Sequence, residues 1–153
     1  MNYKQLLIDN FAFKTSYVAQ FVPGMSIKET KDYIAVDCGL PADTFNIITL
    51  LNNNLTEGVE KLYKEVEYYN QKKFPMSVWL WDEEQERDIK SELNKIGLKE
   101  AEQNIAMVAD LKTISPTIHM PVSFTIQQAS SPGLIKKFGE TLANLFGTSE
   151  EAI

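Results

Sequence analysis

The sequence predicts an α/β fold in which helices cover both faces of a mixed β-sheet. Short apolar runs alternate along the chain with longer amphipathic segments. One of these runs, at residues 74–81, is apolar on both faces apart from Ser77, and such a strand needs a helix on each side of its sheet. The chain has 153 residues with 44% hydrophobic content, which is enough for one domain with a sizeable core.

The first fifty residues predict one helix and two strands. Residues 3–21 carry apolar side chains at helical spacing, and Pro23 with Gly24 interrupts this pattern. Residues 33–37 and 45–50 are short apolar runs, which are typical of strands.

The clearest helical pattern covers residues 54–72. Asn54, with Glu57 three residues later, is typical of a helix N-terminus. The apolar side chains that fall on one face of this helix are Leu55, Val59, Leu62, Val66 and Tyr69. The strand at residues 74–81 follows this helix.

A further helix and strand are expected after residue 81. Carboxylates at residues 82–84 suit the positive end of a helix dipole. Gly97 is expected to end this helix in a left-handed conformation, with Leu98 as the apolar residue just past it. The expected buried stripe is Ile89, Leu93 and Ile96, and the alternating residues of the next strand are Ile105, Met107, Ala109 and Leu111.

A second unit is predicted to begin near His119, after a linker at residues 113–117. Residues 121–126 resemble a strand, and Ser131 with Pro132 is typical of a helix start. Residues 148–151, Thr-Ser-Glu-Glu, form a capping box that predicts another helix start, two residues before the sequence ends. We therefore interpret the chain as a fragment that ends inside a second domain.

Composition argues against several partners. The net charge of −6 opposes binding to nucleic acid and to anionic lipid, so neither is expected as a partner. Arg87 is the single arginine, which leaves little capacity for bidentate capture of phosphate. The single cysteine, Cys38, is expected to be a small core residue at a strand end. No apolar run is long enough to span a membrane and no signal-peptide core is found, so a cytoplasmic location is expected.

The middle of the chain resembles the GNAT acetyltransferase superfamily. The order strand, helix, strand, helix, strand is similar to the second half of a GNAT domain, and Gly97–Leu98 matches the Gly-Phe pair that closes its last helix. Residues 74–79 and 104–111 resemble the N-terminal region of two-domain bacterial GNAT proteins. The resemblance covers roughly residues 33–111. It implies a degenerate GNAT-like domain at residues 1–116 and the start of a second, incomplete one at residues 117–153.

The resemblance also implies that this chain has lost the functional residues of the family. The acetyl-CoA loop of the family aligns with Asn53, Thr56 and Gly58, and only Gly58 matches. Thr56 adds a side chain where backbone would approach pyrophosphate, and Glu57 and Glu60 add like charge nearby. The tyrosine acid of the family aligns with Leu93, which cannot donate a proton. No catalytic residue and no bound cofactor are therefore expected for this chain, and acetyl-CoA is implied for its parent protein.

Three other features could carry function. His119 could act as a general base, or lie at a domain boundary. The acidic run at residues 82–88 could hold a cation, or could open a helix, and its spacing lacks the loop of a calcium site, so no metal is expected. Trp79 and Trp81 lie on one face of their strand and could pack in the core, line a ligand pocket or meet a partner domain.

The function expected from the resemblance is that of a non-catalytic N-terminal domain in a tandem acetyltransferase. It would support the acceptor-substrate cleft of a catalytic domain, with a second GNAT domain or a homodimer mate as partner. Two alternatives remain open. One is a free-standing binding module that dimerises, and the other is a single-domain acetyltransferase with an unconventional coenzyme A loop.

Overall fold

The computed structural model describes residues 2–52, 55, 58–81, 86–114 and 123–146. The chain divides into two compact units, Met1–Ala106 and Met107–Ile153. The elements of the first unit are α1 (Tyr3–Tyr17), the 3-10 helix η1 (Val18–Gln20), β1 (Ser26–Glu29), β2 (Tyr33–Asp37), β3 (Ile47–Leu50), α2 (Val59–Lys72), β4 (Ser77–Trp79) and α3 (Glu86–Lys95). The second unit contains α4 (Pro132–Phe146).

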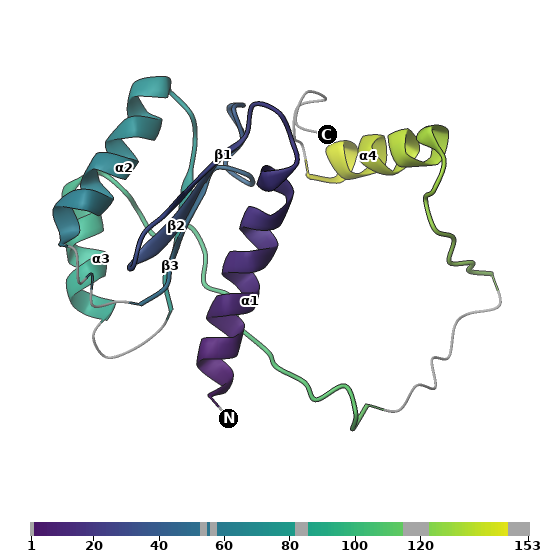
Figure 1. Ribbon diagram of the computed structural model, residues 1–153, viewed down its shortest axis with the longest axis horizontal. Coiled ribbons are helices and arrows are strands. Elements are labelled where there is room, and N and C mark those ends of the chain that lie inside the picture. The colour runs from purple at the N-terminus through teal and green to yellow at the C-terminus, as the bar shows by residue number, and fades with distance from the viewer. Residues whose placement is uncertain (1, 53–54, 56–57, 82–85, 115–122, 147–153) are drawn as a thin grey trace. The chain divides into compact units, whose positions relative to one another are not determined.

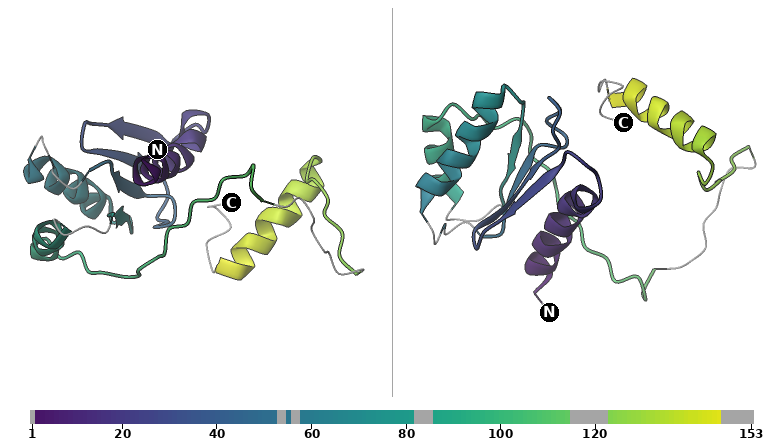
Figure 2. Two further views of the ribbon diagram at one scale, coloured as in Figure 1. Left: turned by 90° about the horizontal axis from the view of Figure 1, so that it is seen from below. Right: turned by 45° about the horizontal axis from the view of Figure 1, so that its top comes forward.

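The first unit is built on a mixed sheet with the strand order β1-β2-β3-β4. The pairs β1–β2 and β2–β3 are antiparallel, whereas β3 and β4 run parallel, with Ile48 opposite Val78. The crossover between the parallel strands contains α2. Helices α2 and α3 lie on one face of the sheet and α1 lies on the other (Figures 1 and 2). The predicted α/β class, a mixed sheet with helices on both faces, is thus confirmed.

The main core lies between the sheet and helices α2 and α3. Its buried members are Tyr33, Ala35, Ile48, Leu50, Leu62, Val66, Tyr69, Ile89 and Leu93. Tyr69 also donates a hydrogen bond from its hydroxyl to the backbone oxygen of Val36, at 2.9 Å. Between the two helices, Tyr63 donates to the carboxylate of Glu92. This hydrogen bond is the main reason why the pKa of Tyr63 rises to about 12.

Helix α1 covers the opposite face of the sheet. Its residues Ile8, Ala12 and Ser16 are buried there. The ring of Phe11 packs against Trp79 and Trp81, with centroid separations of 4.6 and 5.6 Å. Side chains alternate along a strand, so Trp79 lies on this face while its neighbour Val78 packs against the core on the other.

A buried amide ties the turn after β2 to the strands beyond it. Asn46 has none of its surface exposed. Its side-chain oxygen accepts from the backbone N–H of Cys38 at 3.0 Å, and its nitrogen donates to the backbone oxygens of Leu40 and Pro75 at 2.8 and 3.1 Å. Cys38, which directly follows β2, is buried, as the sequence predicts for a small core residue at a strand end.

The helix ends show where local sequence signals hold and where they fail. Gly97 adopts φ of 88°, and the N–H of Leu98 donates to the C=O of Leu93 at 3.1 Å, so the predicted left-handed ending of α3 is confirmed. Helix α2 begins at Val59 rather than at Asn54. The reason is Gly58, whose φ of 89° and ψ of 146° place it outside the helical region.

Three strand predictions differ from the structure. Strand β1 was not expected, because Ile27 is its one apolar residue and an outer strand needs little apolar patterning. Residues 104–111 were predicted as a strand but form none, and Ile105 is 90% exposed. Residues 123–126 form no strand either, and Ile126 is 82% exposed. Apolar alternation makes a strand only where a neighbouring strand supplies hydrogen bonds.

In the second unit, the predicted helix after Ser131 is confirmed as α4. The hydroxyl of Ser131 accepts from the N–H of Leu134 at 3.3 Å and so caps the helix. Apolar side chains of α4 are only partly covered, because Leu134 is half-buried whereas Phe138 and Leu145 are 59% and 71% exposed.

Candidate functional site

The position predicted for a cofactor phosphate is the N-terminus of α2, which follows β3. At such a junction the free N–H groups of a helix attract anions. The exposed carboxylate of Glu60 lies beside this position, because a Cβ placed on Gly58 would come within 2.7 Å of its Oε2 atom. The N–H of Gly58 is engaged as well, because it donates to the C=O of Leu55 at 2.9 Å. A phosphate approaching Gly58 would therefore meet the negative charge of Glu60.

The carboxyl ends of the parallel strands are the second place where a ligand would be expected in a sheet of this kind. The indole N–H of Trp81 donates to the backbone oxygen of Leu50 at 2.6 Å, so Trp81 bridges the end of β3 to the chain that follows β4. Trp79 and Trp81 are both half-buried, and Phe11 of α1 covers part of each ring. The structure thus shows core packing for this pair, while a role in ligand or domain contact stays a prediction.

Leu93 aligns with the family's tyrosine acid, and the structure places it in the main core with 6% of its surface exposed. Its aliphatic side chain contributes to packing beneath α2 and α3.

A groove that the sequence did not predict lies between α2 and strands β1 and β2. It has a volume of about 340 Å³, and its walls carry two carboxylates, Asp37 and Glu65, that are each only 5% exposed. The residues that line it are Ser26, Lys28, Ala35, Asp37, Lys64, Glu65, Tyr68 and Tyr69.

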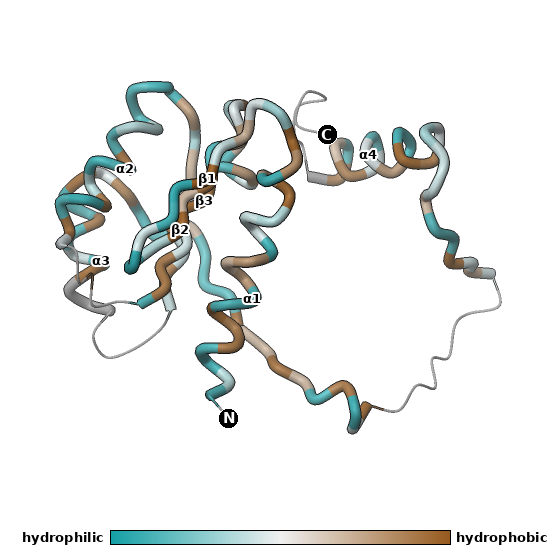
Figure 3. The backbone as a smooth tube through the Cα atoms, in the orientation of Figure 1, coloured by the Kyte–Doolittle hydropathy of each residue, from teal (hydrophilic) through white to brown (hydrophobic). Residues whose placement is uncertain are grey.

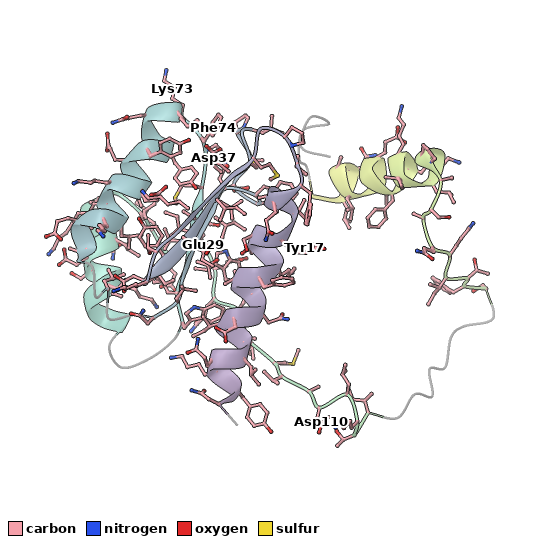
Figure 4. The ribbon with its side chains drawn as sticks, viewed as in Figure 1. Tyr17, Glu29, Asp37, Lys73, Phe74 and Asp110 are labelled. Atoms are coloured by element: carbon pink, nitrogen blue, oxygen red, sulfur yellow. The ribbon has the colours of Figure 1, made fainter. Side chains whose placement is uncertain are left out.

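At one end of the groove, Asp37 accepts three hydrogen bonds. The donors are the ammonium of Lys72, the hydroxyl of Tyr68 at 2.6 Å and the N–H of Gly39 at 2.8 Å. Figure 4 shows Asp37 near the C-terminal end of α2, where Phe74 is labelled, and the Lys72 ammonium lies 4.8 Å from the centre of the Phe74 ring. Burial by itself would raise the pKa of Asp37, but the bonds from Lys72, Tyr68 and Gly39 outweigh it, so the pKa lies below its ordinary value.

At the other end of the groove, Lys28 of β1 forms an ion pair with Glu65 of α2. The hydroxyl of Tyr33 lies 3.4 Å from the same carboxylate. The hydrogen bond to Glu65 raises the pKa of Lys28 above its ordinary value, although partial burial acts in the opposite direction. This contact joins an outer strand of the sheet to α2.

The groove is suited to holding elements together rather than to proton transfer. Asp37 stays ionised near neutral pH and is a weak base, because three donors stabilise its charge. Glu65 forms an ion pair with Lys28 that joins α2 to β1. The sequence did contain a signal for both acids: Asp37 shares a strand face with Tyr33 and Ala35, and Glu65 lies beside Leu62 and Val66 on the apolar side of its helix. Carboxylates at such positions need partners.

Several predicted residues lie outside the described part of the chain. These are Asn53, Thr56, Glu57, His119 and the acidic residues at 82–84. Among the residues that the structure does describe, no group of three or more metal-ligating side chains could hold a metal ion. Within the same set, no helix has the length and apolar character needed to cross a membrane.

Comparison of the chain with protein-family models, with curated proteins and with solved structures finds no match.

Proposed function

We propose that this chain is a non-catalytic GNAT-like domain that supports the acceptor-substrate cleft of a catalytic acetyltransferase domain. Its partner would be a second GNAT domain or a homodimer mate. The observation that carries this proposal is the contact between Glu60 and Gly58 at the N-terminus of α2. A helix start that binds a phosphate favours negative charge from the ligand, and here a carboxylate of the same helix lies beside Gly58 and would repel it.

Three further observations support a structural role. Strand β3, helix α2, strand β4 and helix α3 follow one another in the order on which the resemblance rests, whereas its final strand, at residues 104–111, is not formed. At the carboxyl end of the parallel strands, the Trp81 indole bonds the Leu50 carbonyl and so uses a backbone acceptor that a ligand would otherwise reach. Leu93, buried in the core, offers no proton to a departing thiolate.

Titration calorimetry with acetyl-CoA tests this function directly. We expect no heat of binding for the 153-residue chain at millimolar acetyl-CoA, because Glu60 opposes the pyrophosphate at the α2 N-terminus. The matched variant is Glu60→Gln, which keeps the shape of the side chain and removes its charge. Micromolar binding by the unaltered chain would contradict the proposal and favour the alternative of a single-domain acetyltransferase. Binding by Glu60→Gln alone would identify the carboxylate as the group that blocks the site.

A further inference from the structure

Helix α1 is apolar on both of its sides, although only one side faces the sheet. The side that carries Ile8 and Ala12 is buried. Side chains on the opposite side are exposed: Tyr3 by 58%, Leu6 by 43%, Phe13 by 58% and Tyr17 by 46%. In Figure 3, hydrophobic residues recur along α1, and Tyr17 is labelled on this helix in Figure 4. An apolar face of a helix normally packs against another element.

The exposed side has the spacing of a coiled-coil contact. We define the outer face of α1 by residues 3, 6, 10, 13 and 17, which recur at intervals of three and four residues. In heptad terms these are positions a, d, a, d and a, which form one stripe over two heptads. The only polar residue of the stripe is Asn10, at an a position. A single Asn at an a position is a known device for fixing the register and number of paired helices.

The charges beside the outer face fit a second copy in parallel orientation. Asp9 occupies position g of the first heptad and Lys14 occupies position e of the second, and both are exposed. In a parallel pair, a g residue meets the e residue five positions further along the other helix, so Asp9 of each copy would meet Lys14 of the other. In an antiparallel pair, g positions meet g positions, which would bring the two Asp9 carboxylates together. The Nε2 atom of Gln5 donates to Asp9 at 2.8 Å and holds it on this flank.

We propose that the outer face of α1 is a homodimer interface, in which the α1 helices of two copies pack in parallel about a two-fold axis. Aromatic rings pack against one another along this side, with centroid separations of 5.1 Å between Phe13 and Tyr17 and 5.1 Å between Tyr17 and Phe21. Aromatic side chains contribute large contact areas to interfaces. This surface is different from the Trp79 and Trp81 face, and its role does not depend on acetyltransferase chemistry.

Charge exchange tests the interface through the oligomeric state of the full chain. We expect sedimentation velocity to show a concentration-dependent dimer. Asp9→Lys and Lys14→Asp should each weaken it by roughly tenfold or more, because two cross-helix pairs per dimer change from attraction to repulsion. An equal mixture of the two variants should restore dimers, since lysines of one chain then meet aspartates of the other. The matched control is Lys99→Asp, which makes the same charge change at another exposed position and should leave the dimer unchanged.

Disulfide cross-linking tests the orientation. In a Cys38→Ser background, Tyr17→Cys should form a covalent dimer under mild oxidation, because a parallel pair brings the two copies of position 17 together. Cross-links that appear only when Tyr3→Cys is mixed with Tyr17→Cys would show antiparallel packing and overturn the proposal. A monomer at every concentration, whether the face is left open or is covered by another part of the same chain, would overturn it as well. So would a dimer that Asp9→Lys and Lys14→Asp leave unchanged.

Discussion

Replacement of Leu62 by alanine is expected to lower the free energy of unfolding of the first unit by about 2–5 kcal/mol. Leu62 has none of its surface exposed and lies in the core between α2 and the sheet. The substitution removes apolar surface from that core and leaves a cavity that close-packed neighbours fill only partly. Such a change is a large fraction of the stability of an ordinary domain.

Urea unfolding followed by circular dichroism measures this effect, with Lys64→Ala as the matched control. Lys64 lies on the same helix and is exposed, so its replacement by the same residue should change stability by only about 0.5 kcal/mol. If Leu62→Ala were as mild as Lys64→Ala, the face of α2 that we place against the sheet would be wrong.

The sequence was sufficient to predict the elements that are long or strongly patterned. The apolar stripe at residues 54–72 gave α2 and its buried face, because a 3.6-residue period is specified by many side chains at once. Strand β2 was predicted with its observed limits, Tyr33–Asp37. The end of α3 was predicted from Gly97 alone, because few residues adopt positive φ as readily as glycine.

The predictions that failed concern features that depend on partners far away in the sequence. Residues 104–111 alternate as a strand does, yet alternation does not supply the neighbouring strand that would bond to it. Strand β1 is the converse case: its apolar pattern is weak, yet it pairs with β2. The groove could not be predicted from the sequence, because Asp37 accepts hydrogen bonds from Tyr68 and Lys72, which lie more than thirty residues away. The sequence places the charge of Glu60 near the helix start, and the structure adds that its Oε2 atom lies beside Gly58.

The second large effect is expected at Asp37, whose replacement by asparagine should cost about 1–3 kcal/mol at neutral pH. Asparagine keeps the shape of the side chain but loses the charge that Lys72, Tyr68 and the Gly39 N–H stabilise. Because the folded-state pKa of Asp37 lies below its ordinary value, its contribution is present above the unfolded pKa of about 3.9 and is lost as pH falls through the folded value.

The difference in unfolding free energy between the unaltered chain and Asp37→Asn should therefore be constant from pH 7 to about pH 5 and should shrink below about pH 4. Asp43→Asn is the matched control, because Asp43 is exposed and its loss should be almost neutral at every pH. A difference that grew as the solution became more acidic would mean that the folded state raises the pKa of Asp37. In that case desolvation would outweigh the three hydrogen bonds, and the groove would hold a protonatable acid rather than a fixed ion pair joining β2 to α2.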